Sequence, residues 1–366
     1  MALSIGIIGL PNVGKSTVFN ALTGAQNAEV ANYPFCTINP NRAIVPLKDP
    51  RLEDLKKLTR VENIIYATIE FVDIAGLVKG ASLGEGLGNQ FLSHIRNTDA
   101  LIHIVRGFDD PNVIHIHGEL NPREDIEIIN VELALADLAQ LEKKIKNLDS
   151  DVKGDKNLIP QLELSRSLKD HLSRGLPASS HPDIGSTIFQ DLNKEMRFLT
   201  AKPVIYAVNV DETGLLETNP FVEEVSEIAR ECGSDMVVLC GKLEEEMVDM
   251  APDEISEFLE LIGAKASGLD QIVELGFKTL GLINYFTKNE NEVRAWTIPQ
   301  GTKAPQAAGK IHTDFEKGFI RAEVVSYDEY KKLGSDAAVK SAGMMRSEGK
   351  DYVVADGDVI LFRFNV

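Results

Sequence analysis

The fold of this chain is decided by Gly9-Leu10-Pro11-Asn12-Val13-Gly14-Lys15-Ser16. This stretch matches the spacing G-x-x-x-x-G-K-[ST], in which the backbone N–H groups of a glycine-rich loop surround phosphate groups. The apolar run Leu3–Ile8 precedes it, and a helical stretch from about Lys15 to Leu22 follows. The partial positive charge of that helix N-terminus favours bound anions. The sequence therefore predicts a P-loop α/β domain that binds a nucleoside triphosphate.

The residue types of the loop predict individual roles. Lys15 should reach the outer phosphates, and the hydroxyl of Ser16 should ligate Mg²⁺. Asn12 lies where several related switches hold a monovalent cation, so K⁺ is a candidate cofactor. An asparagine that only caps the loop explains the sequence equally well. The nucleotide-binding residues that we predict in this part of the chain are Asn12, Val13, Gly14, Lys15, Ser16 and Thr17.

Four later apolar runs are continuous, as is typical of parallel strands covered on both faces. They are Thr68–Val72, Ala100–Val105, Val204–Val208 and Met236–Leu239. Asp73-Ile74-Ala75-Gly76 follows the first run, so Asp73 suits a place behind the water ligands of Mg²⁺, and the Gly76 N–H can bind the γ-phosphate. Thr37, between these two motifs, is a candidate switch threonine that closes on the metal. A plain loop threonine is the alternative.

Two further loops are candidates for reading the base. Asn209-Val210-Asp211-Glu212 follows Val204–Val208 and departs from the Asn-Lys-x-Asp of guanine-specific proteins. Cys240-Gly241-Lys242 follows the next strand, where a second base-contacting loop would lie. Glu212 is one methylene longer than the aspartate that accepts two hydrogen bonds from guanine, and Val210 removes the usual lysine. These two differences predict that ATP is preferred over GTP.

The residue after Asp73–Gly76 is Leu77. Ras-like switches have a glutamine here that orients the attacking water, and leucine has no hydrogen-bonding group. Hydrolysis is therefore either very slow, or another group positions the water. His115 and His117 follow the strand Ala100–Val105 on the ligand side of the sheet, and a surface loop is the alternative reading of both.

Residues 123–200 follow a helical pattern. Apolar residues alternate at spacings of three and four, as in a coiled-coil seam: Val131, Ala134, Leu138, Leu141, Ile145 and Leu148. Asp149–Asn157 is polar and predicts a hairpin tip, and a second helix is expected to begin at Pro160. An antiparallel helical hairpin inserted into the α/β domain is the simplest interpretation. Ordinary packed surface helices are the alternative.

Residues 281–366 return to strand-like alternation. Strands are predicted at Glu292–Ile298, Ile320–Val325 and Asp351–Phe364, with a tight hairpin turn at Ala355–Asp358. We thus predict three parts. Residues 1–122 and 201–280 form the nucleotide-binding domain, residues 123–200 form the helical insert, and residues 281–366 form a small mixed β/α domain.

The composition excludes several classes of protein. The net charge of −18 argues against non-specific DNA or RNA binding by the whole chain. Most of that charge lies in the nucleotide-binding part, because residues 123–200 and 283–366 are close to neutral. There is no run of 18 apolar residues and no signal peptide, so we expect no membrane span. Three cysteines without metal-site spacing fit a reduced cytoplasm.

Several long motifs carry a family resemblance. Besides residues 9–16, they are Asn-Tyr-Pro-Phe-Cys-Thr at 32–37, Asp-Ile-Ala-Gly-Leu-Val-Lys-Gly-Ala-Ser at 73–82, Gly-Glu-Gly-Leu-Gly-Asn-Gln-Phe at 84–91, Ala-Gly-Lys-Ile-His-Thr-Asp-Phe at 308–315, Glu-Gly-Lys-Asp-Tyr-Val-Val at 348–354 and Phe-Arg-Phe-Asn-Val at 362–366. Over essentially its whole length the chain resembles the YchF / Obg-like ATPase family. The resemblance implies an Obg-type nucleotide domain, an inserted helical coiled-coil domain and a C-terminal TGS domain with a β-grasp fold. It also implies an ATPase that associates with ribosomes, with His115 matching the histidine proposed to supply the missing catalytic function.

We therefore expect a cytoplasmic, monomeric, Mg²⁺-dependent ATPase that hydrolyses ATP to ADP and phosphate and acts as a molecular switch on ribosomes. The catalytic residues would be Lys15, Gly76 and His115, and the metal residues Ser16, Thr37 and Asp73. A GTPase translation factor is one alternative. Another is an RNA-binding or ribosome-binding adaptor whose nucleotide is structural, and a P-loop kinase with an acceptor pocket is a third.

Overall fold

The structure is a computed structural model, and it describes residues 3–29, 41–74, 87–110, 113 and 120–365. The described residues group into two compact units. The first unit holds residues 3–24, 41–43 and 70–272, and the second holds residues 25–29, 44–69 and 273–365. Each unit is thus assembled from segments that are far apart in the sequence. No described helix is both long enough and apolar enough to cross a membrane.

The first unit contains most of a six-stranded sheet in the order β2-β4-β1-β5-β6-β7, of which residues 44–47 and 67–69 belong to the second unit. The strands are β1 (Ser4–Ile8), β2 (Arg42–Leu47), β4 (Ala67–Asp73), β5 (Ala100–Arg106), β6 (Val204–Asn209) and β7 (Asp235–Leu239). β1 pairs in parallel with β4 and β5, β5 with β6, and β6 with β7. β1 and β5 are buried along their whole length, as the continuous apolar runs predict. The five strands predicted for this domain are confirmed, to within one residue at each end.

Helices connect these strands. They are α1 (Lys15–Glu29), α3 (Leu87–Arg96), α7 (Pro220–Cys232), α8 (Gly241–Met247), α9 (Pro252–Leu261) and α10 (Gly268–Thr279). α1 begins at Lys15 as predicted and continues seven residues beyond Leu22. Because neighbouring strands are parallel, the loops after β1, β4, β5, β6 and β7 leave the sheet at one edge. Four of the predicted motifs begin at or directly after the carboxyl ends of these strands.

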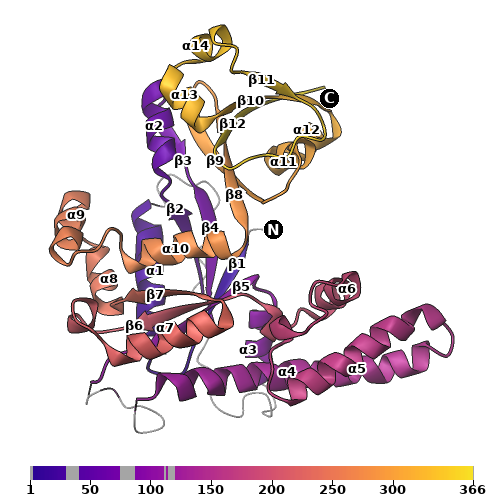
Figure 1. Cartoon of the computed structure of the whole chain (residues 1–366). Helices are drawn as coiled ribbons and strands as arrows, with labels where there is room; N and C mark the ends of the chain where they lie inside the picture. Colours follow the sequence, from indigo (N-terminus) through magenta and orange to yellow (C-terminus); the bar gives the residue numbers. More distant parts are fainter. Residues whose placement is uncertain (1–2, 30–40, 75–86, 111–112, 114–119, 366) are drawn as a thin grey trace. The chain divides into compact units, whose positions relative to one another are not determined.

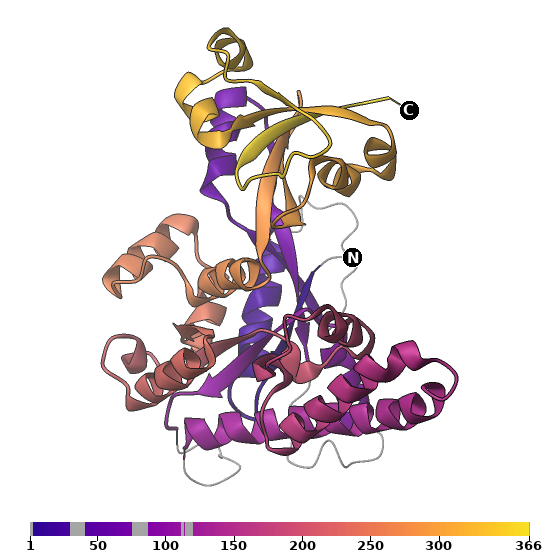
Figure 2. The same cartoon turned by 45° about the vertical axis from the view of Figure 1, so that its right-hand side comes forward.

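A helical hairpin follows β5 in this unit. α4 (Pro122–Asp151) and α5 (Ile159–Ser173) lie side by side in both ribbon views, and α6 (Thr187–Met196) packs against them (Figures 1 and 2). α5 has Pro160 in its first turn, as predicted. The buried core of this hairpin is apolar and comes from all three helices and the chain beside them: Ala134, Leu141, Leu164, Leu168, Leu172, Ala178, Phe189, Leu192, Met196 and Phe198. The sequence did not predict α6.

The predicted seam of α4 is wrong at its first residue. Val131 is 50% exposed, whereas Leu141 and Leu148 are fully buried. The reason is that the first half of α4 packs on the sheet through Ile126, which shares a core with Tyr206 and Val208. The buried face of a helix that changes partner along its length rotates, so one heptad register cannot describe it.

One buried carboxylate fixes α4 to the start of β6. Asp137 has no exposed surface, and it accepts hydrogen bonds from the backbone N–H groups of Leu199 and Thr200, each at 2.9 Å. The Thr200 hydroxyl donates to it at 2.8 Å, and Arg96 pairs with it at 3.0 Å. Since a buried charge is tolerated only when it is paired, this network fixes where the chain enters β6.

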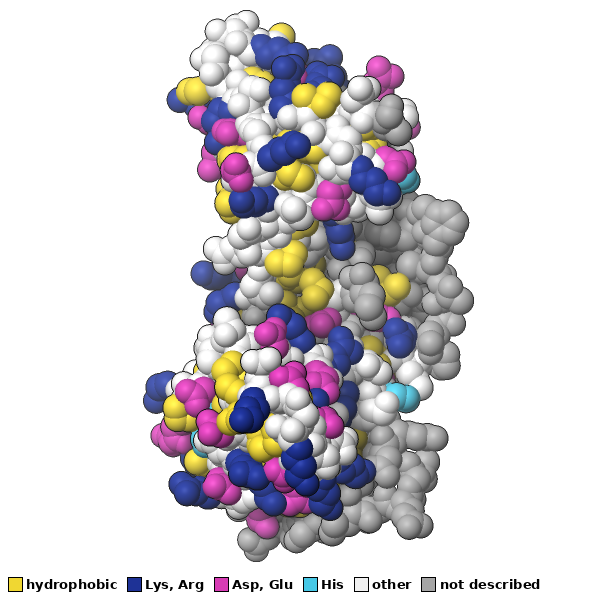
Figure 3. Space-filling model, turned by 90° about the vertical axis from the view of Figure 1, so that its right-hand side faces the viewer, with side chains coloured by type: hydrophobic (Ala, Val, Ile, Leu, Met, Phe, Trp, Pro, Cys, Tyr) yellow, Lys and Arg dark blue, Asp and Glu magenta, His cyan; other side chains and the backbone are white. Residues whose placement is uncertain are grey.

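The outer surface of the hairpin carries both signs of charge. Arg166 pairs with Asp149 at 2.6 Å, and Lys169 pairs with Glu142 at 2.8 Å. Figure 3 looks toward this part of the molecule, and basic, acidic and apolar side chains are interspersed on it. On the face that Figure 3 shows, no single-sign patch covers the hairpin, in agreement with its nearly neutral composition.

The second unit has its own six-stranded sheet, in the order β11-β10-β12-β8-β9-β3. The strands are β3 (Asn63–Ile65), β8 (Leu282–Lys288), β9 (Glu292–Pro299), β10 (Phe319–Ser326), β11 (Arg346–Glu348) and β12 (Asp358–Phe364). Its helices are α2 (Pro50–Thr59), α11 (Ala304–Ile311), α12 (Thr313–Lys317), α13 (Tyr327–Leu333) and α14 (Asp336–Ser341). One face of the sheet, with α11, forms a core that contains Tyr285, Ala307, Ala308, Val324, Ile360 and Phe362.

The predicted C-terminal hairpin is wrong. Only Asp358–Phe364 of the predicted strand Asp351–Phe364 is a strand. Ala355–Asp358 does form a turn, with the Asp358 N–H donating to the Ala355 carbonyl at 3.2 Å. That turn joins no hairpin, because β12 pairs with β10 and with β8 instead.

Residues from the first quarter of the chain complete this second unit. β3 adds to the edge of β9 in parallel, with Ile64 opposite Val293. On α2, Arg51 bridges Asp49 and Asp356, each at 2.7 Å, and its guanidinium lies 5.0 Å above the Phe286 ring centre. The C-terminal sheet is therefore completed at its edge by a segment that lies, in the sequence, within the nucleotide-binding part.

Candidate functional site

The P-loop has a backbone that only particular residues adopt easily. Gly14 has φ +95°, and a Cβ built on it would lie 2.1 Å from the Asn209 Nδ2. Gly9 has φ +151°, and its Cβ would lie 2.5 Å from the Ile104 carbonyl oxygen. Asn12 is left-handed at φ +63°, a conformation that asparagine tolerates better than most residues. The spacing of the motif is thus explained by steric limits on both sides of the loop.

Lys15 is more buried than the sequence suggested. Its side chain is only 7% exposed, and its Nζ donates a hydrogen bond to the Leu10 carbonyl at 2.6 Å. Burial lowers the pKa of Lys15 to about 8, and the nearby Asp73 carboxylate opposes that shift. Burial also raises the pKa of Asp73, against the attraction of Lys15. The Lys15 ammonium and the Asp73 carboxylate are therefore near enough to attract each other.

Asn209 ties three loops together. Its Nδ2 donates to the Val13 carbonyl at 3.0 Å, and its Oδ1 accepts from the Gly241 N–H at 2.8 Å. The side chain is buried, so these bonds are shielded from water. The sequence predicted Asn209 to contact the base. In the structure its amide holds the P-loop and the loop after β7 at a fixed separation.

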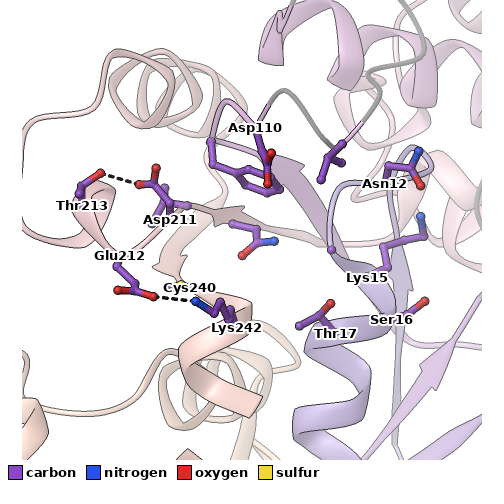
Figure 4. Close-up of a pocket in the computed structure, with 15 residues that line it drawn as sticks. Asn12, Lys15, Ser16, Thr17, Asp110, Asp211, Glu212, Thr213, Cys240 and Lys242 are labelled. Atoms are coloured by element: carbon purple, nitrogen blue, oxygen red, sulfur yellow. Dashed lines mark hydrogen bonds and ion pairs between the residues drawn. The ribbon is translucent and has the colours of Figure 1, made fainter. Parts of the chain in front are cut away.

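These loops enclose a pocket of about 640 Å³ at the carboxyl edge of the sheet (Figure 4). It is lined by Asn12, Gly14, Lys15, Ser16, Thr17, Phe108, Asp110, Val113, Asn209, Val210, Asp211, Glu212, Thr213, Cys240 and Lys242. Nine of the predicted nucleotide-binding residues thus share one cavity. Val13 and Gly241 do not line it, because both are buried and act through the backbone groups that Asn209 binds.

The wall opposite the P-loop carries two carboxylates that already have partners. Asp211 Oδ1 accepts from the Thr213 hydroxyl at 2.9 Å and from the Gly214 N–H at 2.8 Å. Glu212 Oε1 pairs with Lys242 Nζ at 3.0 Å (Figure 4). Val210 is 2% exposed and packs into the core beside β6.

The sequence analysis placed His115 and His117 after β5 but missed the pocket residues at the start of the same loop. Phe108, Asp110 and Val113 form one side of the pocket. Buried Arg106 holds them in place, since it donates to the carbonyls of Phe108 and Val113, both at 2.9 Å, and stacks 4.6 Å from the Phe108 ring centre. The available signal was Arg106 itself, a charged residue that directly ends an apolar run.

Several predicted residues lie outside the described residues. They are Thr37, Gly76 and His115, together with Leu77 and His117. Of the predicted Mg²⁺ residues, the structure therefore describes Ser16 and Asp73. Within the described part of the chain, no cluster of three or more His, Cys, Asp or Glu side chains could hold a metal.

Comparisons with known proteins cover the whole chain. The family model described as "50S ribosome-binding GTPase" matches residues 4–147, and the model YchF-GTPase_C, described as "Protein of unknown function (DUF933)", matches residues 282–365. The chain is 48% identical to "Ribosome-binding ATPase YchF" of Bacillus subtilis (strain 168) and to that of Escherichia coli O157:H7, over 100% of each chain. A solved structure of the Schizosaccharomyces pombe YchF GTPase is 37% identical and covers 99% of this chain and 97% of its own, with a TM-score of 0.88. The resemblance and the P-loop fold predicted from the sequence are confirmed, and the chain belongs to the YchF family of P-loop proteins.

Proposed function

We propose that this chain is an Mg²⁺-dependent ATPase that binds ribosomes and acts as a nucleotide-driven molecular switch. The observation that carries the proposal is the single pocket with the P-loop on one side and the loops 209–213 and 240–242 on the other. A P-loop binds phosphates, so the base of a nucleotide would lie toward those two loops. The bacterial relatives are named ribosome-binding ATPases, which supports both the reaction and the partner.

The residues at the phosphate end fit this chemistry. Lys15 would exchange the Leu10 carbonyl for phosphate oxygens, and its desolvated ammonium would favour the charge that develops there. Ser16 and Thr37 would ligate Mg²⁺, and Asp73 would bind its waters. Hydroxyl and carboxylate oxygens are the donors that this ion prefers. The bound ion would supply positive charge between the outer phosphates.

Hydrolysis is proposed to be slow without an activator, since Leu77 cannot orient water. The Gly76 N–H would bind the γ-phosphate, His115 would position the water, and Asn12 would hold K⁺. Single-turnover rates at saturating ATP should fall in His115→Ala and much less in His117→Ala. Equal rates in His115→Ala and the parent would exclude the proposed role of His115. Equal rates in potassium and sodium chloride would exclude the cation site.

The choice of base is proposed to favour ATP. Glu212 and Val210 replace residues that guanine-specific loops need. A site that leaves the guanine donors unpaired binds guanine about 1–3 kcal/mol less favourably. GTP is the second candidate, because the solved S. pombe relative is titled a GTPase. Unlabelled ATP and GTP competing against one fluorescent nucleotide would decide, and tighter binding of GTP would make the protein a GTPase.

The ribosome is proposed to contact the helical domain, residues 123–200, and the C-terminal TGS domain, residues 281–366. We propose a monomer that acts in the cytoplasm. Lys15→Ala should lose phosphate release from ATP while retaining its far-UV circular dichroism. Co-sedimentation of the parent and Lys15→Ala with ribosomes, with and without ATP, tests the switch. Ribosome binding that is identical in all four conditions would indicate an adaptor with a structural nucleotide.

A further inference from the structure

The ion pair between Glu212 and Lys242 crosses the base end of the pocket. Glu212 follows β6, and Lys242 lies in the first turn of α8, so two separate loops meet there (Figure 4). The Nζ to Oε1 distance is 3.0 Å. Glu246, one helical turn further along α8, also attracts the ammonium, and the pKa of Lys242 is raised, chiefly by its hydrogen bond to Glu212.

The pairing changes what Glu212 can offer a base. The Watson–Crick edge of guanine presents two donors, a ring N–H and an amine, and a free carboxylate accepts both. Adenine presents one acceptor and one donor at the same edge. Asp211 is already engaged by Thr213 and Gly214, so Glu212 is the remaining carboxylate in this loop. With Oε1 bound to Lys242, that carboxylate is no longer a free two-oxygen acceptor.

We propose that Lys242 is a specificity-determining residue that rejects guanine by occupying the Glu212 carboxylate. The inference rests on the proposed nucleotide-binding function and adds a named residue to it. Lys242 acts through Glu212, so it is a positioning residue. Removing Lys242 should free Glu212 to accept the guanine donors. Selectivity against guanine would thus depend both on the longer glutamate side chain and on its ion-pair partner on α8.

The test measures equilibrium dissociation constants of Mg·ATP and Mg·GTP for the parent, Lys242→Ala, Glu212→Ala and the double variant. Lys242→Ala should shift the ratio of the two dissociation constants toward GTP by about two- to fivefold, the range expected when one exposed, charge-assisted contact is exchanged for another. In the Glu212→Ala background, Lys242→Ala should have no further effect. Lys242→Arg, which keeps the pair, should resemble the parent.

A control outside the pocket keeps the outcome decisive. Lys169→Ala removes an exposed ion pair of α5 that does not line the pocket, and it should leave both constants unchanged. A ratio that is unchanged or shifted toward ATP in Lys242→Ala would overturn the inference, as would an equal effect of Lys242→Ala with and without Glu212. If the parent bound neither nucleotide, the proposed function itself would fail. A parent that binds ATP while Lys242→Ala shows no shift toward GTP would remove only the role of Lys242.

Discussion

At the scale of single residues, Gly14 lies where a side chain has neither the backbone nor the space it needs. A methyl group there would meet the Asn209 amide at 2.1 Å, and φ +95° is unfavourable for any L-residue. Gly14→Ala should therefore push Asn209 away from Val13 and Gly241 and open the frame of the pocket. We expect nucleotide binding to fall at least tenfold, because the P-loop amides lose their alignment, and the binding constants of Mg·ATP would show it.

Gly175 is the matched control for this substitution. It has φ +77°, but a Cβ there would meet no atom within 4 Å. Gly175→Ala should cost only the left-handed backbone penalty, about 1–2 kcal/mol, and leave ATP binding intact. If both variants lost binding equally, the close contact with Asn209 would not be the cause.

At the scale of elements, the attachment of α4 to the start of β6 depends on Asp137. Asp137→Asn places an amide NH₂ among three donors and removes the charge that Arg96 binds. Breaking a buried pair of this kind costs about 3–5 kcal/mol, and we expect that loss in the free energy of unfolding by urea. Asp149→Asn, which removes the exposed pair with Arg166, should cost less than about 1 kcal/mol. Similar costs for both would contradict the anchoring role.

The contact between α8 and the start of α10 should depend on pH. Glu244 on α8 accepts from the Gly268 N–H at 2.6 Å at the start of α10, and burial raises its pKa to about 7 from 4.5. The folded state thus holds this proton more tightly than the unfolded state. The stability that Glu244 contributes is complete below pH 4.5 and is lost as the pH rises to about 7.

The measurement compares the parent with Glu244→Gln in urea at pH 4.5, 5.5 and 7. The parent should lose about 3 kcal/mol relative to the variant across this range, from 1.36 kcal/mol per pKa unit. Exposed Glu257→Gln is the control and should show a constant difference. A constant difference for Glu244→Gln as well would mean that its folded pKa is ordinary.

The strands differ in how well sequence patterns predict them. Strands β1, β4, β5, β6 and β7 were predictable because each is a largely apolar run next to a motif. β3 has three residues and pairs with β9, more than two hundred residues later, so no local pattern records it. In the site, the P-loop and base loops were predicted from residue types. Phe108 was not, because it belongs to no nucleotide-binding motif, and only the contacts of buried Arg106 with it place it against the pocket.

At the scale of the whole molecule, the second unit needs residues 44–69. Residues 273–366 alone would lack β3, leaving the edge of β9 unpaired, and would lack the Arg51–Asp356 pair. Such a fragment should melt roughly 10–20 °C below the same fragment fused to residues 44–69, if about 2–3 kcal/mol of contacts is lost. It should also associate through the open strand edge.

Calorimetry and sedimentation of the two fragments would measure both effects. Arg51→Ala in the fused fragment is the control, and it should reproduce part of the drop in melting temperature without exposing the β9 edge. Identical melting temperatures for the fused and unfused fragments would show that residues 44–69 contribute nothing to this unit.

The pairing of β3 with β9 also imposes a delay during synthesis. β3 leaves the ribosome early, and its partner strand is translated more than two hundred residues later. At about 5–20 residues per second, the interval is roughly 10–45 s. During this interval α2 and β3 lack the rest of their unit, because it has not yet been synthesised. The neighbouring strands of the other sheet can already assemble. The nascent chain must therefore keep this segment out of wrong pairings until its last quarter is made.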